Sequence, residues 1–133
     1  MKVTGLILLL SLLPAFWLKE ADARPKYRYD AFTETCRTLY TGPLEYDSRS
    51  YGRGGRMFQQ VCKACHTRDN DKGAPFLWTE SHTSNGWNRV FAERYPKCAK
   101  DGSWDNVSLD DLQLINDYLY RFGYGSQDIT DSC

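Results

Sequence analysis

The sequence has no excess of charge of either sign and no run of lysine or arginine. Its 133 residues include 17 basic and 17 acidic side chains, so the formal net charge is zero. A balanced chain lacks the basic footprint that polyanion binding needs, and we do not expect a nucleic acid partner. Internal repeats and low-complexity tracts are also absent. The length suits one small domain and excludes two-domain enzymes and Rossmann units.

Long hydrophobic runs are absent except at the N-terminus. Residues 3–18 are mostly apolar, follow Lys2, and precede the small-x-small pattern Ala21-Asp22-Ala23. This arrangement predicts a signal peptide over residues 1–23, although the charged pair at 19–20 leaves an uncleaved N-terminal anchor as the alternative. The stretch is too short and too interrupted for a comfortable membrane span. We therefore expect a periplasmic or otherwise exported protein with no membrane span in the mature chain.

Cysteine, by contrast, is abundant, with five residues in the chain. Two of them stand in Cys62-Lys63-Ala64-Cys65-His66, the CxxCH pattern of c-type haem attachment. The two thiols add to the two vinyl groups of one haem, and the histidine binds the iron. A thioredoxin-like redox pair would need a βαβ context, and a zinc site a second cysteine or histidine pair, and the sequence has neither. A second CxxCH is absent, so we predict one covalently attached haem c, with His66 as the proximal iron ligand.

Three segments have helical periodicity. The first ends on the thiols and carries apolar residues at i, i+3, i+4 and i+7: Phe58, Val61, Cys62 and Cys65. The second spans about residues 85–95, stops before Pro96, and is marked by Trp87, Val90, Phe91 and Arg94. The third begins at a Ser108 cap, closes at Gly123, and carries Leu109, Leu112, Ile115 and Leu119.

The order of these segments resembles that of the small monohaem class I cytochromes c. The resemblance covers about residues 52–122 and rests on the pattern Gly-x-x-x-Phe-x-x-x-Cys-x-x-Cys-His and on the last helix. It implies that the first and last helices cross, with Phe58 packed against the region of Leu112, Tyr118 and Leu119. We therefore expect an all-α fold, with about three main helices and long loops around one haem. Residues 24–51 would form an extension of loop and short helix, and residues 52–133 the haem domain with a C-terminal tail.

A short loop adds to the resemblance. Gly73-Ala74-Pro75-Phe76-Leu77 is similar to the family's Gly-x-Pro-x-Leu loop, whose proline carbonyl accepts the Nδ1 hydrogen of the proximal histidine. Such a bond to Pro75 would fix the tautomer of His66 and raise its basicity. Taken without the rest of the pattern, the loop is an ordinary turn.

Methionine is scarce, and here the chain departs from the family. Most members place a distal methionine before the last helix, but besides Met1 this chain has only Met57, just upstream of Cys62. A side chain on the attachment helix cannot reach the opposite haem face. The distal position therefore falls to Cys98, His82, Lys97 or Lys100, or the iron is left open.

Cys98 lies shortly before the Ser108 cap, where the family presents its distal ligand, but it also competes for a disulfide. Of Cys36, Cys98 and Cys133 only two can pair within one chain, and spacing does not decide which two. Pairing of Cys36 with Cys133 would leave Cys98 free for iron. His82 follows the proline loop on the proximal side, so distal binding by it would need a rearranged loop. Otherwise His82 is a surface or propionate-contacting residue.

The expected function follows from the cofactor. The leading hypothesis is one-electron transfer between redox partner proteins, which makes the chain an electron carrier in preference to a stand-alone enzyme. An open iron would instead favour binding or sensing of oxygen, nitric oxide or carbon monoxide. A His66/Cys98 haem would favour a redox subunit in sulfur-compound oxidation, because a soft thiolate lowers the haem potential and can engage sulfur.

Overall fold

The computed structural model describes residues 23–128 and 132–133. In chain order its elements are β1 (Tyr27–Asp30), β2 (Thr35–Thr38), α1 (Gly42–Asp47), α2 (Arg53–Met57), the π-helical turn η1 (Phe58–Cys62), the 3-10 turn η2 (Thr79–Ser81), α3 (Ser84–Glu93), α4 (Lys97–Lys100), α5 (Leu109–Phe122) and the 3-10 turn η3 (Ser126–Asp128). The predicted signal peptide lies outside the described residues, apart from Ala23. Within the described part of the chain, no helix is long and apolar enough to cross a membrane.

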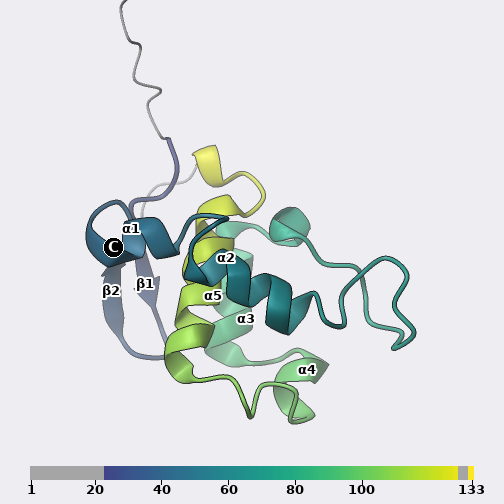
Figure 1. Cartoon of the computed structure of the whole chain (residues 1–133). Coiled ribbons are helices and arrows are strands. Elements are labelled where there is room, and N and C mark those ends of the chain that lie inside the picture. Colours follow the sequence, from purple (N-terminus) through teal and green to yellow (C-terminus); the bar gives the residue numbers. More distant parts are fainter. Residues whose placement is uncertain (1–22, 129–131) are drawn as a thin grey trace, which may run out of the picture.

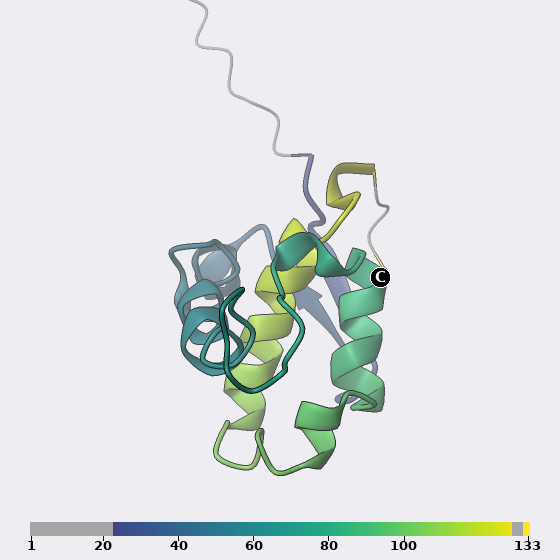
Figure 2. The same ribbon diagram turned by 90° about the vertical axis from the view of Figure 1, so that its right-hand side faces the viewer.

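Helix α5 is the centre of the fold. Helices α2 and α3 pack against it, and the views in Figure 1 and Figure 2 place them on different sides of it. The hydrophobic core between these helices consists of Phe58, Trp87, Val90, Phe91, Leu112, Ile115, Tyr118 and Leu119. The rings of Phe58 and Tyr118 lie 5.9 Å apart, centre to centre. The expected packing of the first predicted helix on the last is therefore confirmed.

The ends of the two longest helices follow from their cap residues. Thr83 Oγ1 accepts a hydrogen bond from the Gly86 backbone at 3.0 Å, and Ser108 Oγ accepts one from the Asp111 backbone at 3.1 Å. Each bond satisfies a backbone donor that the first helical turn leaves without a partner. Helix α3 ends where Arg94 adopts a left-handed conformation, with φ of 48°. The helices predicted over about 85–95 and from Ser108 are both present.

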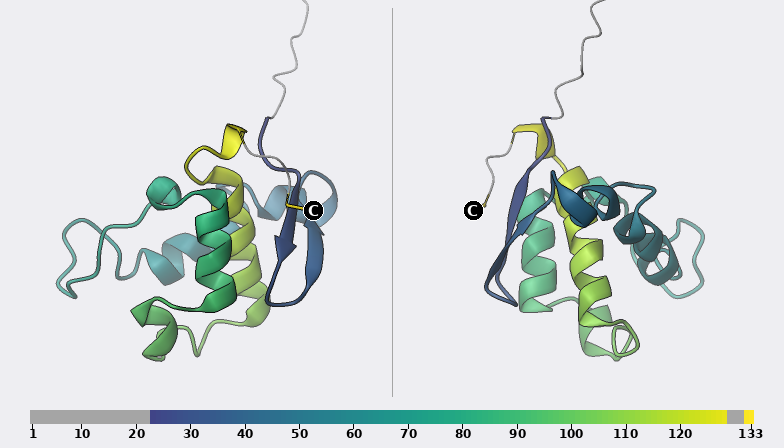
Figure 3. Two further views of the ribbon diagram at one scale, coloured as in Figure 1. Left: turned by 180° about the vertical axis from the view of Figure 1, so that it is seen from behind. Right: turned by 60° about the vertical axis from the view of Figure 1, so that its left-hand side comes forward.

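The expectation of an all-α fold is wrong, because residues 27–38 form an antiparallel β-hairpin. Strand β1 pairs with β2 in a register that sets Tyr29 opposite Cys36. The N-terminal extension, expected as loop and short helix, thus contains α1 and also a two-stranded sheet. Figure 3 shows the hairpin lying along one side of the helices. The fold is a small mixed α/β arrangement.

Charged side chains attach the hairpin to the helices. Arg28 is fully buried, and its guanidinium contacts Asp117 on α5 and Asn88 on α3. Arg37 of β2 reaches the same carboxylate, with Nη2 2.6 Å from Asp117 Oδ2. The inner face of this hairpin is therefore ionic, unlike the apolar inner face of most half-buried sheets.

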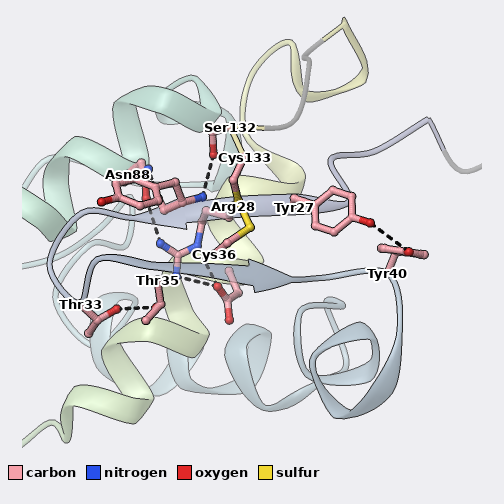
Figure 4. Close-up of a disulfide and its surroundings, with 11 residues drawn as sticks. Tyr27, Arg28, Thr33, Thr35, Cys36, Tyr40, Asn88, Ser132 and Cys133 are labelled. Carbon is pink, nitrogen blue, oxygen red and sulfur yellow. Dashed lines mark hydrogen bonds and ion pairs between the residues drawn. A yellow bond between two sulfur atoms is a disulfide. The ribbon is translucent and has the colours of Figure 1, made fainter.

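A disulfide joins Cys36 of β2 to Cys133 near the C-terminus, as Figure 4 shows. Beside it, the Tyr29 backbone N–H donates to Ser132 Oγ at 2.8 Å, which fixes the tail against the outer side of β1. This bridge is one of the three pairings that the sequence left open. It leaves Cys98 as the remaining cysteine outside the CxxCH motif, with a free thiol.

Candidate functional site

The CxxCH motif lies where helix α2 widens into the π-helical turn η1. The Lys63 N–H donates to the Phe58 carbonyl across this turn at 3.1 Å, and the chain then tightens so that the His66 N–H reaches the Cys62 carbonyl at 2.9 Å. Single π turns inside helices often mark functional sites. The turn brings Cys62, Cys65 and His66 together on one short segment, and both thiols are free and half-buried.

The imidazole of His66 is held through its Nδ1 atom. Its Nδ1 lies 2.7 Å from the carbonyl oxygen of Pro75. A carbonyl can only accept, so Nδ1 carries the hydrogen and Nε2 keeps its lone pair for a metal ion. This is the hydrogen bond that the cytochrome resemblance implied for Pro75. The binding of iron by His66 itself stays a prediction.

The loop that presents Pro75 is closed at its base. The Leu77 N–H donates to the His66 carbonyl at 3.3 Å. Lys63 Nζ, from within the motif, donates to the carbonyls of both His66 and Leu77, at 3.1 and 2.7 Å. The ammonium group therefore holds the two ends of the 66–77 loop together, a role that the sequence pattern did not reveal.

Asn70 organises the tip of the same loop. Its side-chain amide donates to the carbonyls of Thr67 and Ala74, at 2.8 and 2.7 Å. Its Oδ1 accepts from the backbone N–H of Lys72 at 3.1 Å and of Ala74 at 3.0 Å. One side chain thus makes four hydrogen bonds in the segment just before Pro75. No sequence motif marks this residue; the signal that could have found it is an asparagine before the turn at Gly73, where φ is +66°.

Two cations lie over the ring of Phe76 in the same loop. Lys63 Nζ is 3.9 Å from the ring centre, and the Arg68 guanidinium carbon is 4.5 Å from it. Trp78, half-exposed to solvent, meets the same ring edge-on at 5.6 Å. These contacts give the loop an aromatic and basic outer surface and add to its rigidity.

The thiol environment does not resemble that of a redox-active cysteine pair. Burial raises the pKa of Cys62 to about 12, and the nearby thiols of Cys98 and Cys65 add to this rise. A thiol of that kind stays protonated at neutral pH, whereas thiol–disulfide exchange requires a thiolate. A buried, protonated Cys62 is therefore poorly suited to act as the attacking thiolate of a redox pair.

Cys98 lies on α4 and is half-buried. Burial raises the pKa of the Cys98 thiol, and the charges of Asp101 and Cys65 contribute in the same direction. The following segment is anchored because the Trp104 ring stacks on Phe91 of α3, with centres 5.2 Å apart. Helix α4 is thus held against the body of the protein at the end where α5 begins (Figure 1).

The other predicted distal candidates lie elsewhere. Met57 packs against the hydrophobic core. The His82 ring packs edge-on against Trp87, with centres 4.6 Å apart, and its carbonyl accepts from the Tyr124 N–H at 2.9 Å near the end of α5. Lys97 and Lys100 are on the same helix as Cys98, but both are exposed to solvent.

The residues around the motif fit a c-type haem. The site offers two free thiols with the required spacing and an imidazole whose free nitrogen is Nε2. Apolar side chains that pack against the core yet stay partly exposed come from η1, from the loop and from the segment before α5: Val61, Leu77, Trp104 and Val107. A flat apolar cofactor would cover such side chains. In the described ranges, no group of three or more histidine, cysteine, aspartate or glutamate side chains is placed to hold a bare metal ion.

No family model, curated protein or solved structure matches this chain. What it does must therefore be inferred from the geometry of Cys62, Cys65, His66 and the residues that surround them.

Proposed function

We propose that this protein is a monohaem c-type cytochrome that carries single electrons between partner proteins in the periplasm or another oxidising compartment. The observation that supports this most strongly is the arrangement of two free, correctly spaced thiols beside His66, whose Nδ1 is bound to the Pro75 carbonyl. The Cys36–Cys133 disulfide supports an oxidising compartment, because such bonds are rare in the cytosol.

In this proposal Cys62 and Cys65 hold the haem covalently. Each thiol adds across one vinyl group, so that a carbon–sulfur bond forms and the thiol hydrogen moves to the neighbouring vinyl carbon. The addition needs no external oxidant. The bound haem supplies an iron that changes its charge by one unit, and every other role belongs to the chain.

His66 would bind the iron through Nε2. The Pro75 carbonyl accepts the Nδ1 hydrogen, which holds the ring in one tautomer and increases its electron donation to a metal. The base of the loop, closed by Lys63, and its tip, organised by Asn70, keep that carbonyl in place. A ligand held in this way moves little when the iron changes oxidation state, which suits electron transfer.

The proposal is tested by producing the full chain in a bacterial periplasm that contains the haem-attachment machinery. We expect the purified protein to retain one haem through denaturing electrophoresis and to show a mass increased by one haem. The haemochrome spectrum in alkaline pyridine should be that of a haem with both vinyl groups saturated. Voltammetry should then show one reversible one-electron wave.

Two variants complete this experiment. The double variant Cys62→Ala, Cys65→Ala should carry no covalent haem, whereas Lys97→Ala, which changes an exposed residue outside the motif, should carry the normal amount. A wild-type chain that folds with its disulfide formed but acquires no haem would overturn the proposal. So would a haem that is attached but cannot be reduced and reoxidised reversibly.

A further inference from the structure

The two strands of the hairpin each have an outer edge. The Leu39 N–H donates to the Lys26 carbonyl at 2.7 Å, so this pair is bonded across the hairpin. Bonded and non-bonded pairs alternate along an antiparallel ladder. The register therefore directs the backbone N–H and C=O groups of Tyr29 in β1, and those of Cys36 and Thr38 in β2, away from the opposite strand.

The outer edge of β1 is capped. The Tyr29 N–H donates to Ser132 Oγ at 2.8 Å, and the Tyr29 carbonyl accepts from Asn88 Nδ2 at 2.7 Å. Asn88 belongs to α3, and Ser132 belongs to the tail that the disulfide holds. A strand edge that is covered by a helix and a tail cannot pair with another chain.

The outer edge of β2 is open. No hydrogen bond from any of the described residues reaches the outward backbone groups of Cys36 or Thr38. Thr35 and Cys36 are exposed to solvent, and Figure 1 shows β2 as the strand further from α3. The tail does not cover this edge, because Ser132 and Cys133 lie on the β1 side of Cys36 (Figure 4).

The open edge also lacks the residues that normally keep an edge strand single. Such strands carry an outward lysine, a proline or a bulge. Strand β2 reads Thr35-Cys36-Arg37-Thr38, and its one charged side chain turns inward, with Arg37 Nη2 2.6 Å from Asp117 Oδ2. A second strand can therefore approach this edge without meeting a charge or a missing backbone donor.

We infer that the protein forms a two-fold symmetric dimer in which the β2 strands of two copies pair antiparallel, edge to edge. Cys36 and Thr38 are two positions apart, so with the axis at Arg37 each of them faces the other residue in the second copy. Every outward N–H of one strand then meets an outward carbonyl of the other, and the edge is complementary to itself. At the axis the two Arg37 side chains each keep Asp117 of their own chain as counter-charge.

The capped edge of β1 limits the assembly to two copies. Joining two hairpins through β2 gives a four-stranded sheet, which is more stable than an isolated pair of strands. Its two outer strands are both β1, whose edges are covered by Asn88 and Ser132, so no open edge is left for a third copy. The hairpin lies on the side of the molecule away from the 66–77 loop (Figure 1), so both candidate sites stay accessible in the dimer.

The test is the molecular mass of the full chain with its disulfide formed, measured by analytical ultracentrifugation over a range of concentrations. The wild type should pass from the mass of one chain to that of two as the concentration rises. Thr38→Pro removes an outward N–H that the hairpin itself does not use, and should raise the dissociation constant about tenfold or more. Thr38→Val keeps this N–H and a strand-forming side chain, and as the matched control should dimerise like the wild type.

Hydrogen exchange of single backbone amides tests the same pairing without a variant. The amides of Cys36 and Thr38 should exchange fast in dilute solution and slowly in concentrated solution, because only the dimer offers them acceptors. The Arg37 amide is bonded to β1 in both states and is the internal control. It should exchange slowly at every concentration.

The inference does not depend on the haem, so it can fail while the proposed function holds. A protein that stays monomeric over the whole range overturns it. So does a dimer that is equally stable in Thr38→Pro, since the copies then meet at another surface. If Thr38→Pro does not fold, the amides decide: exchange at Cys36 and Thr38 that is independent of concentration overturns the inference, as does slowing that requires an added peptide of another sequence.

Discussion

Arg28 of β1 and Asp117 of α5 form a fully buried ion pair. Arg28 Nη2 lies 2.7 Å from Asp117 Oδ1, and neither side chain is accessible to solvent. Arg28 Nε donates to the same oxygen at 2.8 Å, and Arg37 contacts the second carboxylate oxygen from β2. One carboxylate therefore binds both strands of the hairpin to the central helix.

Replacing this carboxylate should be strongly destabilising. In the Asp117→Ala variant two guanidinium groups at the same interface lose their main counter-charge, and breaking a buried pair in this way costs about 3–5 kcal/mol. The free energy of unfolding, measured by urea denaturation with the disulfide intact, should fall by that amount. The matched control is Glu93→Ala, which removes an exposed pair with Arg89 and should leave the denaturation midpoint unchanged. Equal effects of the two variants would contradict the prediction.

Stability should fall in acid partly through Asp30. Burial alone would raise the pKa of this carboxyl, but the Arg28 charge and the hydrogen bonds from Arg28, Thr33 and Phe32 outweigh it and hold the pKa below its usual 3.8. A lowered pKa in the folded state gives stability that is fully present above pH 3.8 and is lost as the pH falls through the folded-state value. The unfolding free energy of Asp30→Asn should therefore depend less steeply on pH below 3.8. Parallel curves for variant and wild type would show that Asp30 does not contribute.

Loss of the disulfide should destabilise the fold without changing the haem site. The bridge closes a sequence separation of 97 residues, for which loop-closure entropy predicts a loss of about 4–5 kcal/mol in the double variant Cys36→Ser, Cys133→Ser. Thermal unfolding measures the loss, and Ser132→Ala, which removes only the neighbouring hydrogen bond, should show a smaller drop. The hairpin lies on the side of the molecule away from the 66–77 loop (Figure 1), so the haem spectrum should not change. A changed spectrum would show that the haem site depends on the bridge.

Asn70 should act as a positioning residue for His66. Without its four hydrogen bonds, Asn70→Ala should let the Pro75 carbonyl move away from Nδ1 and weaken the electron donation of the imidazole to iron. We expect the haem to remain attached and its reduction potential to rise. Thr67→Ala, at an exposed neighbouring side chain, is the control and should leave the potential unchanged. An unchanged potential in Asn70→Ala would show that the rest of the loop is sufficient to hold the carbonyl.

Helices α3 and α5 could be predicted because each has apolar residues at helical spacing and begins at a capping residue, Thr83 and Ser108 respectively. The hairpin could not be predicted, because in β1 the charged side chains face the core and an aromatic side chain faces solvent, the reverse of the usual alternation in a strand. Arg28 and Asp30 point inward while Tyr29 lies outside, so a reading that places apolar side chains in the core finds no strand here. The charged inner face is stable because Asp117 of α5, 89 residues further along the chain than Arg28, supplies its counter-charge.

The candidate site divides in the same way. Cys62, Cys65 and His66 follow a local spacing and could be recognised in the sequence, as could the Pro75 loop through its resemblance to the cytochromes. The supporting contacts of Lys63 and Asn70 were not visible, since they depend on where backbone carbonyls point after folding. Cysteine pairing was also undetermined, because spacing alone does not fix connectivity.

The Cys36–Cys133 bond turns the chain between these residues into a covalent ring. A protease that cuts one peptide bond inside this ring, for example in the 66–77 loop, produces two polypeptides that remain one molecule. In a compartment where proteases act, such a nicked molecule would keep both halves of the candidate site within reach of each other. A single cut would therefore change the chain's connectivity without releasing a fragment.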